Sequence, residues 1–131
     1  MELCAAVACL ALLEYLVFVM RAGRARGVYG VPAPATSGHP LFERHLRVQQ
    51  NTIEQLVVFL PALFLFARYV SPVWGAGLGL VFVLGRGLYA HAYVNDPSKR
   101  GPGFALSLAV NLVLTLGALV GIIGVGAYRL V

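Results

Sequence analysis

The sequence predicts an all-α membrane protein, a bundle of four transmembrane helices. Hydrophobic residues make up 60% of its 131 residues and charged residues only 11%, whereas a soluble domain of this length needs more polar surface. Apolar residues gather in four stretches that approach or exceed the roughly 20 residues needed to cross a bilayer core. These stretches are residues 3–20, 53–70, 73–94 and 104–128. The length suits one domain, residues 1–131.

The first stretch resembles a secretory signal in its position near the N-terminus, but we interpret it as a retained helix. The start, Met1-Glu2-Leu3-Cys4, has no basic residue, and the apolar run meets Arg21 without a small-x-small cleavage site. The segment that follows, residues 23–40, is expected to be non-helical because it is rich in glycine and proline.

A second helix is expected to begin at Pro40, since proline suits the first helical turn. It starts polar, becomes apolar only after Gln55, and has Pro61 inside the apolar part, where a kink is expected. Ser71-Pro72 predicts a tight hairpin, and residues 95–103 predict a turn-rich connection. In the fourth stretch, the four-residue spacing of Gly117 and Gly121 favours close packing of helices.

The net charge of +5 is interpreted as an orientation signal, and no nucleic-acid partner is expected. Basic residues concentrate in the first connection (Arg21, Arg24, Arg26, Arg44, Arg47) and the third (Lys99, Arg100). These two connections share one side of a four-span chain, so the positive-inside rule places them in the cytoplasm and both termini outside. The excess of arginine over lysine indicates a GC-rich genome, which favours a bacterial inner membrane.

Polar side chains at membrane depth are the candidates for function, because each charge there is costly and normally faces the bundle interior. Arg47, Asn51 and Glu54 are spaced by four and three residues, so they share one face of the second helix. On the third helix, one face carries Arg86, Tyr89 and Tyr93, and Asp96 continues it.

Together with Arg100 in the following loop, the two faces predict one cluster near the cytoplasmic side. Arginines bind carboxylates through paired hydrogen bonds, and a glutamate receives an ammonium group. This inventory suits a small zwitterionic ligand with several carboxylates. The alternative is that the groups only satisfy one another, as in an Arg47–Glu54 or Arg86–Asp96 pair.

These residues resemble the MAPEG family, membrane-associated proteins in eicosanoid and glutathione metabolism. Residues 42–54, FERHLRVQQNTIE, are similar to the family signature F-E-R-x-x-R-x-x-x-N-x-x-E. Residues 86–93, RGLYAHAY, resemble its R-x-x-Y-x-x-x-Y stretch, and residues 21–27, RAGRARG, its basic first connection in bacterial members. Gln55 departs from the pattern, because the leukotriene synthase branch has a tyrosine there.

The resemblance implies a homotrimer in which glutathione, the cosubstrate, binds between subunits near the cytoplasmic side. Its charged and amide groups would be held by Arg47, Asn51, Glu54, Tyr89 and Tyr93, with Gln49 as a further contact. By position, Arg100 matches the arginine that stabilises the glutathione thiolate in the leukotriene synthase branch. The implied activity is that of a glutathione transferase or peroxidase acting on lipophilic small molecules among membrane lipids.

Two other functions stay open at the level of sequence. The family also includes a non-catalytic lipid-binding member, so membership alone does not prove an enzyme. Small four-helix multidrug transporters exchange protons for cations through a glutamate in their first helix, and Glu14 is the only charge within the first stretch. A metal site is not expected, because His39, His45 and His91 are scattered without cysteine or carboxylate partners at ligand spacing.

Overall fold

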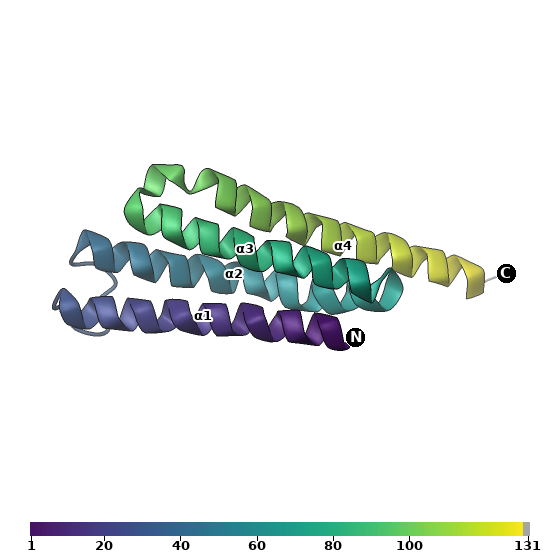
Figure 1. The fold of residues 1–131 in the computed structure, drawn as a ribbon, viewed down its shortest axis with the longest axis horizontal. Coiled ribbons are helices and arrows are strands. Elements are labelled where there is room, and N and C mark those ends of the chain that lie inside the picture. The colour runs from purple at the N-terminus through teal and green to yellow at the C-terminus, as the bar shows by residue number, and fades with distance from the viewer. Residues whose placement is uncertain (130–131) are drawn as a thin grey trace.

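The computed structural model describes residues 1–129 and consists of four long helices joined by short connections. The helices lie side by side along one axis, with both chain ends at the same end of the bundle (Figure 1). Their bounds are α1 Glu2–Val28, α2 Pro40–Tyr69, α3 Pro72–Asn95 and α4 Gly101–Arg129, with a short 3₁₀ helix η1, Pro97–Lys99, before α4.

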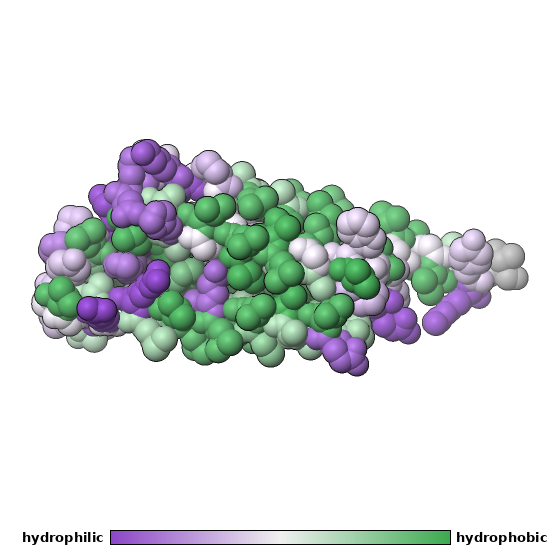
Figure 2. All heavy atoms as spheres, viewed as in Figure 1, coloured by the Kyte–Doolittle hydropathy of each residue, from purple (hydrophilic) through white to green (hydrophobic). Residues whose placement is uncertain are grey.

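All four long helices are long and apolar enough to cross a membrane, which confirms the four predicted spans. Much of their apolar surface faces outward, as a bilayer requires: Leu13, Val57, Leu84 and Val120, one on each helix, are at least 58% exposed. Figure 2 shows this apolar surface over the middle of the bundle, with hydrophilic atoms gathered toward its ends. The chain is an integral, multi-pass membrane protein.

The helix start predicted at Pro40 is confirmed, α3 also begins at a proline, and each helix is capped by the preceding side chain. His39 Nδ1 accepts a hydrogen bond from the Leu41 backbone N–H at 3.2 Å, with Pro40 at the first helical position. Ser71 Oγ accepts from the Trp74 N–H at 3.3 Å, so the α2–α3 connection is the tight hairpin expected.

The prediction that residues 23–40 are non-helical was wrong in its first part, because α1 continues to Val28. Glycine weakens a helix by only about 1 kcal/mol relative to alanine, so Gly23 and Gly27 are tolerated within the last turns. The chain leaves the helix where Gly30 takes a positive φ of 64° and Pro32 follows. The last helix likewise starts at Gly101, before the expected position 104.

Glycines allow α4 to pack closely against α2 and α3. A Cβ atom on Gly117 would lie 2.6 Å from the Phe66 ring, and one on Gly121 would lie 2.7 Å from the Tyr69 carbonyl oxygen. A Cβ on Gly103 would lie 2.5 Å from the Tyr89 backbone nitrogen. The close packing predicted for Gly117 and Gly121 is therefore confirmed, with α2 as the partner helix.

The α1–α2 and α3–α4 connections lie together at one end of the bundle, opposite the chain ends (Figure 1). We call this the basic end, because the connections and their flanking turns carry most of the arginines. Hydrophilic side chains gather over it in Figure 2. The polar residues of α2 and α3 lie toward this end, as the sequence predicts.

Candidate functional site

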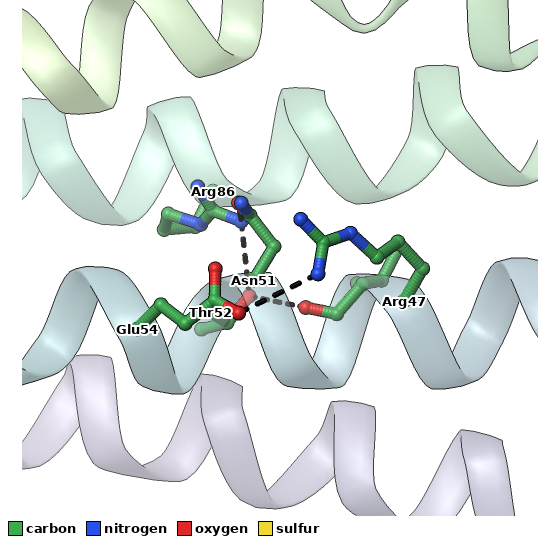
Figure 3. A network of polar contacts seen from close by, with 6 residues as sticks. Arg47, Asn51, Thr52, Glu54 and Arg86 are labelled. Carbon is green, nitrogen blue, oxygen red and sulfur yellow. Dashed lines mark hydrogen bonds and ion pairs between the residues drawn. The ribbon is translucent and has the colours of Figure 1, made fainter. Parts of the chain in front are cut away.

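A buried polar layer joins α2 to α3 and is centred on Arg86, whose side chain is fully buried. The Nη2 group of Arg86 donates one hydrogen bond to Asn51 Oδ1 at 2.7 Å and another to Thr52 Oγ1 at 3.1 Å. Figure 3 shows these contacts crossing from α3 to α2. We call Arg86, Asn51 and Thr52 the buried layer.

Local bonds within each helix fix the direction of these side chains. Thr52 Oγ1 donates to the Val48 carbonyl oxygen at 2.7 Å, which leaves a lone pair of the hydroxyl for Arg86. The Arg86 guanidinium carbon lies 4.3 Å from the centre of the Tyr89 ring, one turn further along α3. The guanidinium is thus held between two side chains of α2 and an aromatic face of its own helix.

Above the buried layer, a cavity of about 230 Å³ opens at the basic end. It is lined by Arg47, Asn51, Tyr89, Arg100 and Phe104. Asn51 belongs to both the buried layer and the cavity lining: Arg86 holds its side-chain oxygen, and the residue borders the cavity. The structure therefore brings together four of the residues that the sequence singles out, from α2, α3 and the turn before α4.

Arg47 and Glu54 form the ion pair considered at the level of sequence, with Nη1 and Oε1 3.4 Å apart. The pair lies along the α2 surface (Figure 3), and its side chains are 44% and 57% exposed. The other pair considered, Arg86 with Asp96, does not form, since Arg86 bonds to Asn51 and Thr52 instead.

Aromatic rings form one wall of the site. The Tyr89 and Tyr93 rings are stacked with their centres 5.5 Å apart, and Phe104 of α4 lies tilted 6.5 Å from Tyr89. Tyr93 is only partly buried and does not itself border the cavity. These rings fix the position of the Tyr89 side chain between the buried layer and the cavity.

Arg100 reaches the cavity because the α3–α4 connection is ordered by Asp96. One carboxylate oxygen of Asp96 accepts hydrogen bonds from the Ser98 hydroxyl at 2.7 Å and the Ser98 N–H at 3.1 Å. These bonds hold the pKa of Asp96 below its usual value, because they favour the charged carboxylate. The turn places Arg100 directly before α4, with its side chain exposed.

Four of the eight predicted site residues do not line the cavity: Glu54 and Tyr93, described above, and Arg86 and Gln49. Arg86 is beneath the cavity, and Gln49, about 200° around α2 from Arg47, is not among its lining residues. Thr52 was missed by sequence reasoning, although it follows Asn51 directly and lies one turn after Val48. A threonine at that spacing commonly bonds the carbonyl four residues back, which was the available signal.

Comparison with known proteins gives one family and several relatives. The model of the MAPEG family matches residues 3–120. An uncharacterized protein of Synechocystis sp. is 51% identical over 119 residues, 91% of this chain and 87% of that protein. Microsomal glutathione S-transferase 2 of Homo sapiens is 40% identical over 120 residues, covering 92% and 82%. Leukotriene C4 synthase of Cavia porcellus is 34% identical over 118 residues, covering 89% and 79%.

Proposed function

The chain belongs to the MAPEG family, and on that premise we propose that it is a membrane-bound glutathione transferase. Its site would activate the thiol of glutathione for attack on lipophilic electrophiles that dissolve in the bilayer. The observation that carries this proposal is the cavity at the basic end, where Arg47, Asn51, Tyr89 and Arg100 converge. Similarity to proteins named microsomal glutathione S-transferase 2 supports the same activity.

The polar groups around the cavity fit a zwitterion such as glutathione. Arg47 supplies paired donors for a carboxylate, and Asn51 supplies an amide donor fixed by Arg86. Glu54 is suited to the ammonium group. In the free protein Arg47 and Glu54 neutralise each other, but an exposed ion pair is worth only about 0–1 kcal/mol. The ligand can therefore replace this pair at little cost.

Arg100 is the candidate for thiol activation. A free thiol has a pKa of about 8.5, so roughly 3% is thiolate at pH 7. A guanidinium beside the sulfur that lowers this pKa by about two units raises the thiolate fraction to roughly three quarters. The thiolate then attacks an electrophilic carbon, forming a carbon–sulfur bond as the electrophile's leaving group departs or its strained ring opens. Lipid hydroperoxides are a second class of acceptor for the same thiolate.

A trimer with the site between subunits completes the proposal. The cavity of one chain, about 230 Å³, is smaller than the roughly 300–1,000 Å³ of small-molecule sites. A neighbouring subunit would enlarge it, and Gln49, on the other side of α2, would then serve the neighbour's site. The basic end would face the cytoplasm, in a bacterial inner membrane, where glutathione is available to it.

The direct test is titration of the detergent-solubilised protein with glutathione while the ultraviolet absorbance of the thiolate is recorded. The wild-type protein is expected to bind at millimolar glutathione or below and to raise thiolate absorbance at neutral pH. Arg100→Ala should bind glutathione but lose the thiolate signal and most of the conjugation rate. Lys99→Ala, an exposed neighbour in the same turn, is the matched control and should behave as wild type.

Absence of binding at millimolar glutathione would refute the transferase proposal. Binding with an unchanged conjugation rate in Arg100→Ala would remove the thiolate role from that residue.

A non-catalytic lipid-binding protein is the second candidate, favoured by an apolar groove of about 350 Å³ between α2 and α4. The groove is lined by Val58, Pro61, Ala62, Leu65, Thr115, Ala118, Leu119 and Ile122. Its lining suits an alkyl chain, which both candidate functions require. Tight binding of a fatty-acid probe without any thiolate signal or conjugation would favour this candidate over the enzyme.

A further inference from the structure

Glu14 is a charge at membrane depth that the proposed reaction does not use. It lies in the middle of α1, is partly buried, and its Oε1 atom is fully buried with no hydrogen-bond partner among residues 1–129. A carboxylate in such a position is costly unless another polar group compensates it. Within residues 1–129, the helices that chiefly pack against α1 and can offer such a group are α2 and α3.

The opposite charge comes from Arg86 on α3. Only Nη2 of this fully buried guanidinium is bonded; Nε and Nη1 are buried without a partner in the described part of the chain. Glu14 approaches the same turn of α3, because a Cβ atom on Gly87 would lie 3.5 Å from Glu14 Oε2. No direct ion pair joins the two side chains within residues 1–129, so what links them is the approach of Glu14 Oε2 to this turn of α3 and the burial of their unpartnered atoms.

Other groups near Arg86 do not replace Glu14. The carboxylate of Glu54 is exposed and lies beside Arg47. Tyr89 offers its ring face to Arg86, which stabilises the cation but accepts no hydrogen bond in the plane of the guanidinium. Glu14 is thus the partly buried carboxylate beside the turn of α3 that carries Arg86, whose two unpartnered nitrogens need an acceptor.

We propose that Glu14 is a positioning residue for the glutathione site, acting through Arg86 and Asn51. Its carboxylate is the counter-charge of Arg86 across α1 and α3, and the two side chains together carry three buried polar atoms that have no other partner in the described chain. The pair fixes the guanidinium so that Nη2 holds Asn51 toward the cavity. This role rests on the proposed function only in its last step, the binding of glutathione.

The first test compares Glu14→Gln with Glu2→Gln, a matched control on the same helix whose carboxylate is exposed. Glu14→Gln should raise the glutathione Kd and KM about tenfold, the loss expected for one hydrogen bond to a charged group. Its kcat should stay within about twofold of wild type, because Arg100 is unaffected. Glu2→Gln should change neither value. Equal glutathione affinities in both variants would overturn the positioning role.

The second test is a double-mutant cycle of Glu14 and Arg86, measured by thermal unfolding, which does not depend on glutathione. Glu14→Gln should lower the Tm in the wild-type background but raise it in an Arg86→Met background, where the carboxylate has lost its counter-charge. The same shift in both backgrounds would mean that Glu14 acts by packing alone, and would overturn the pairing. If Arg86→Met does not fold, Arg86→Gln serves as the background.

The two proposals fail in distinguishable ways. A wild-type protein that does not bind glutathione refutes the transferase, while the unfolding cycle still decides whether Glu14 and Arg86 are paired. The Tm change caused by Glu14→Gln can reverse its sign between the two backgrounds while the glutathione affinity stays unchanged. That result confirms that Glu14 and Arg86 are paired and overturns the role of the pair in the glutathione site. Proton-coupled export abolished by Glu14→Gln, with no sign reversal, overturns both steps and supports a transporter.

Discussion

Helices α2 and α3 contact each other in two different ways along their length. In the apolar core, Phe59 and Phe82 are fully buried and stack with their ring centres 3.9 Å apart and their planes within 4°. Toward the basic end, the contact is the buried layer, in which Arg86 reaches Asn51 and Thr52. The same two helices are thus joined once by dispersion between rings and once by hydrogen bonds to a charge.

The difference indicates that the ring stack stabilises the bundle, whereas the buried layer orients the side chains of the site. Ring packing tolerates substitution by other apolar side chains, because any apolar pair that fits the same space supplies a similar contact. A buried guanidinium is costly in a membrane and is stable only with fixed partners, so its hydrogen bonds set side-chain directions. Only the second contact ends at the cavity, through Asn51. We therefore expect substitutions in the first contact to change stability and those in the second to change ligand binding.

The largest expected effect on stability comes from Phe82→Ala. It leaves a cavity opposite Phe59, and the cost of that cavity persists in lipid while the water-to-core transfer term is absent. We expect the free energy of unfolding to fall by about 2 kcal/mol. Reversible unfolding in mixed detergent micelles measures this change. A variant as stable as wild type would show that the ring stack is not a principal contact between α2 and α3.

A smaller loss of stability is expected from Gly79→Ala on α3, which tests the contact between this apolar region and α1. The new Cβ would lie 2.5 Å from Val7 Cγ1, so α1 must shift or Val7 must change rotamer, at a cost of about 1 kcal/mol. Gly77→Ala is the matched control two positions away, because nothing lies within 4 Å of its Cβ in the described structure. The Tm should fall for Gly79→Ala only; parallel changes in both variants would reflect helix propensity instead.

The smallest effect is expected from Thr52→Val, which keeps the shape of the side chain and removes its hydroxyl. Arg86 then loses its 3.1 Å hydrogen bond but keeps the one to Asn51. We expect the glutathione Kd to rise about threefold, since one of two bonds that position the guanidinium remains. Calorimetric titration measures this shift. Unchanged affinity would show that Thr52 stabilises the bundle without orienting the site.

Most of the fold was predictable because apolar composition marks the membrane spans, and prolines and other turn residues mark the connections between them. The apolar stretches predicted the number of helices, Pro40 predicted one helix start, and Ser71-Pro72 predicted the hairpin between α2 and α3. The end of α1 was not predictable in the same way. Glycine and proline both interrupt helices on average, but Gly23 and Gly27 were accommodated, and the helix stopped only before Gly30.

The lining of the cavity was predictable only in part, since four of the eight predicted site residues border it, and the depth of each residue in the bundle was not predictable. Helical spacing shows which residues share a face, so Arg47 with Asn51, and Arg86 with Tyr89, could be grouped. Spacing does not show how far each residue lies from the neighbouring helix. Burial of Arg86 beneath the cavity depends on how closely α2 and α3 approach, which is a property of the packed bundle.

The contrast between the two contacts is tested most directly by the glutathione Kd of Asn51→Ala and Phe82→Ala, measured side by side with their Tm values. Asn51→Ala removes the group that links Arg86 to the cavity, so its Kd should rise at least about tenfold. Phe82→Ala should keep the wild-type Kd within about twofold despite its lower Tm. Equal losses of affinity in the two variants, or an unchanged Kd in Asn51→Ala, would contradict the account.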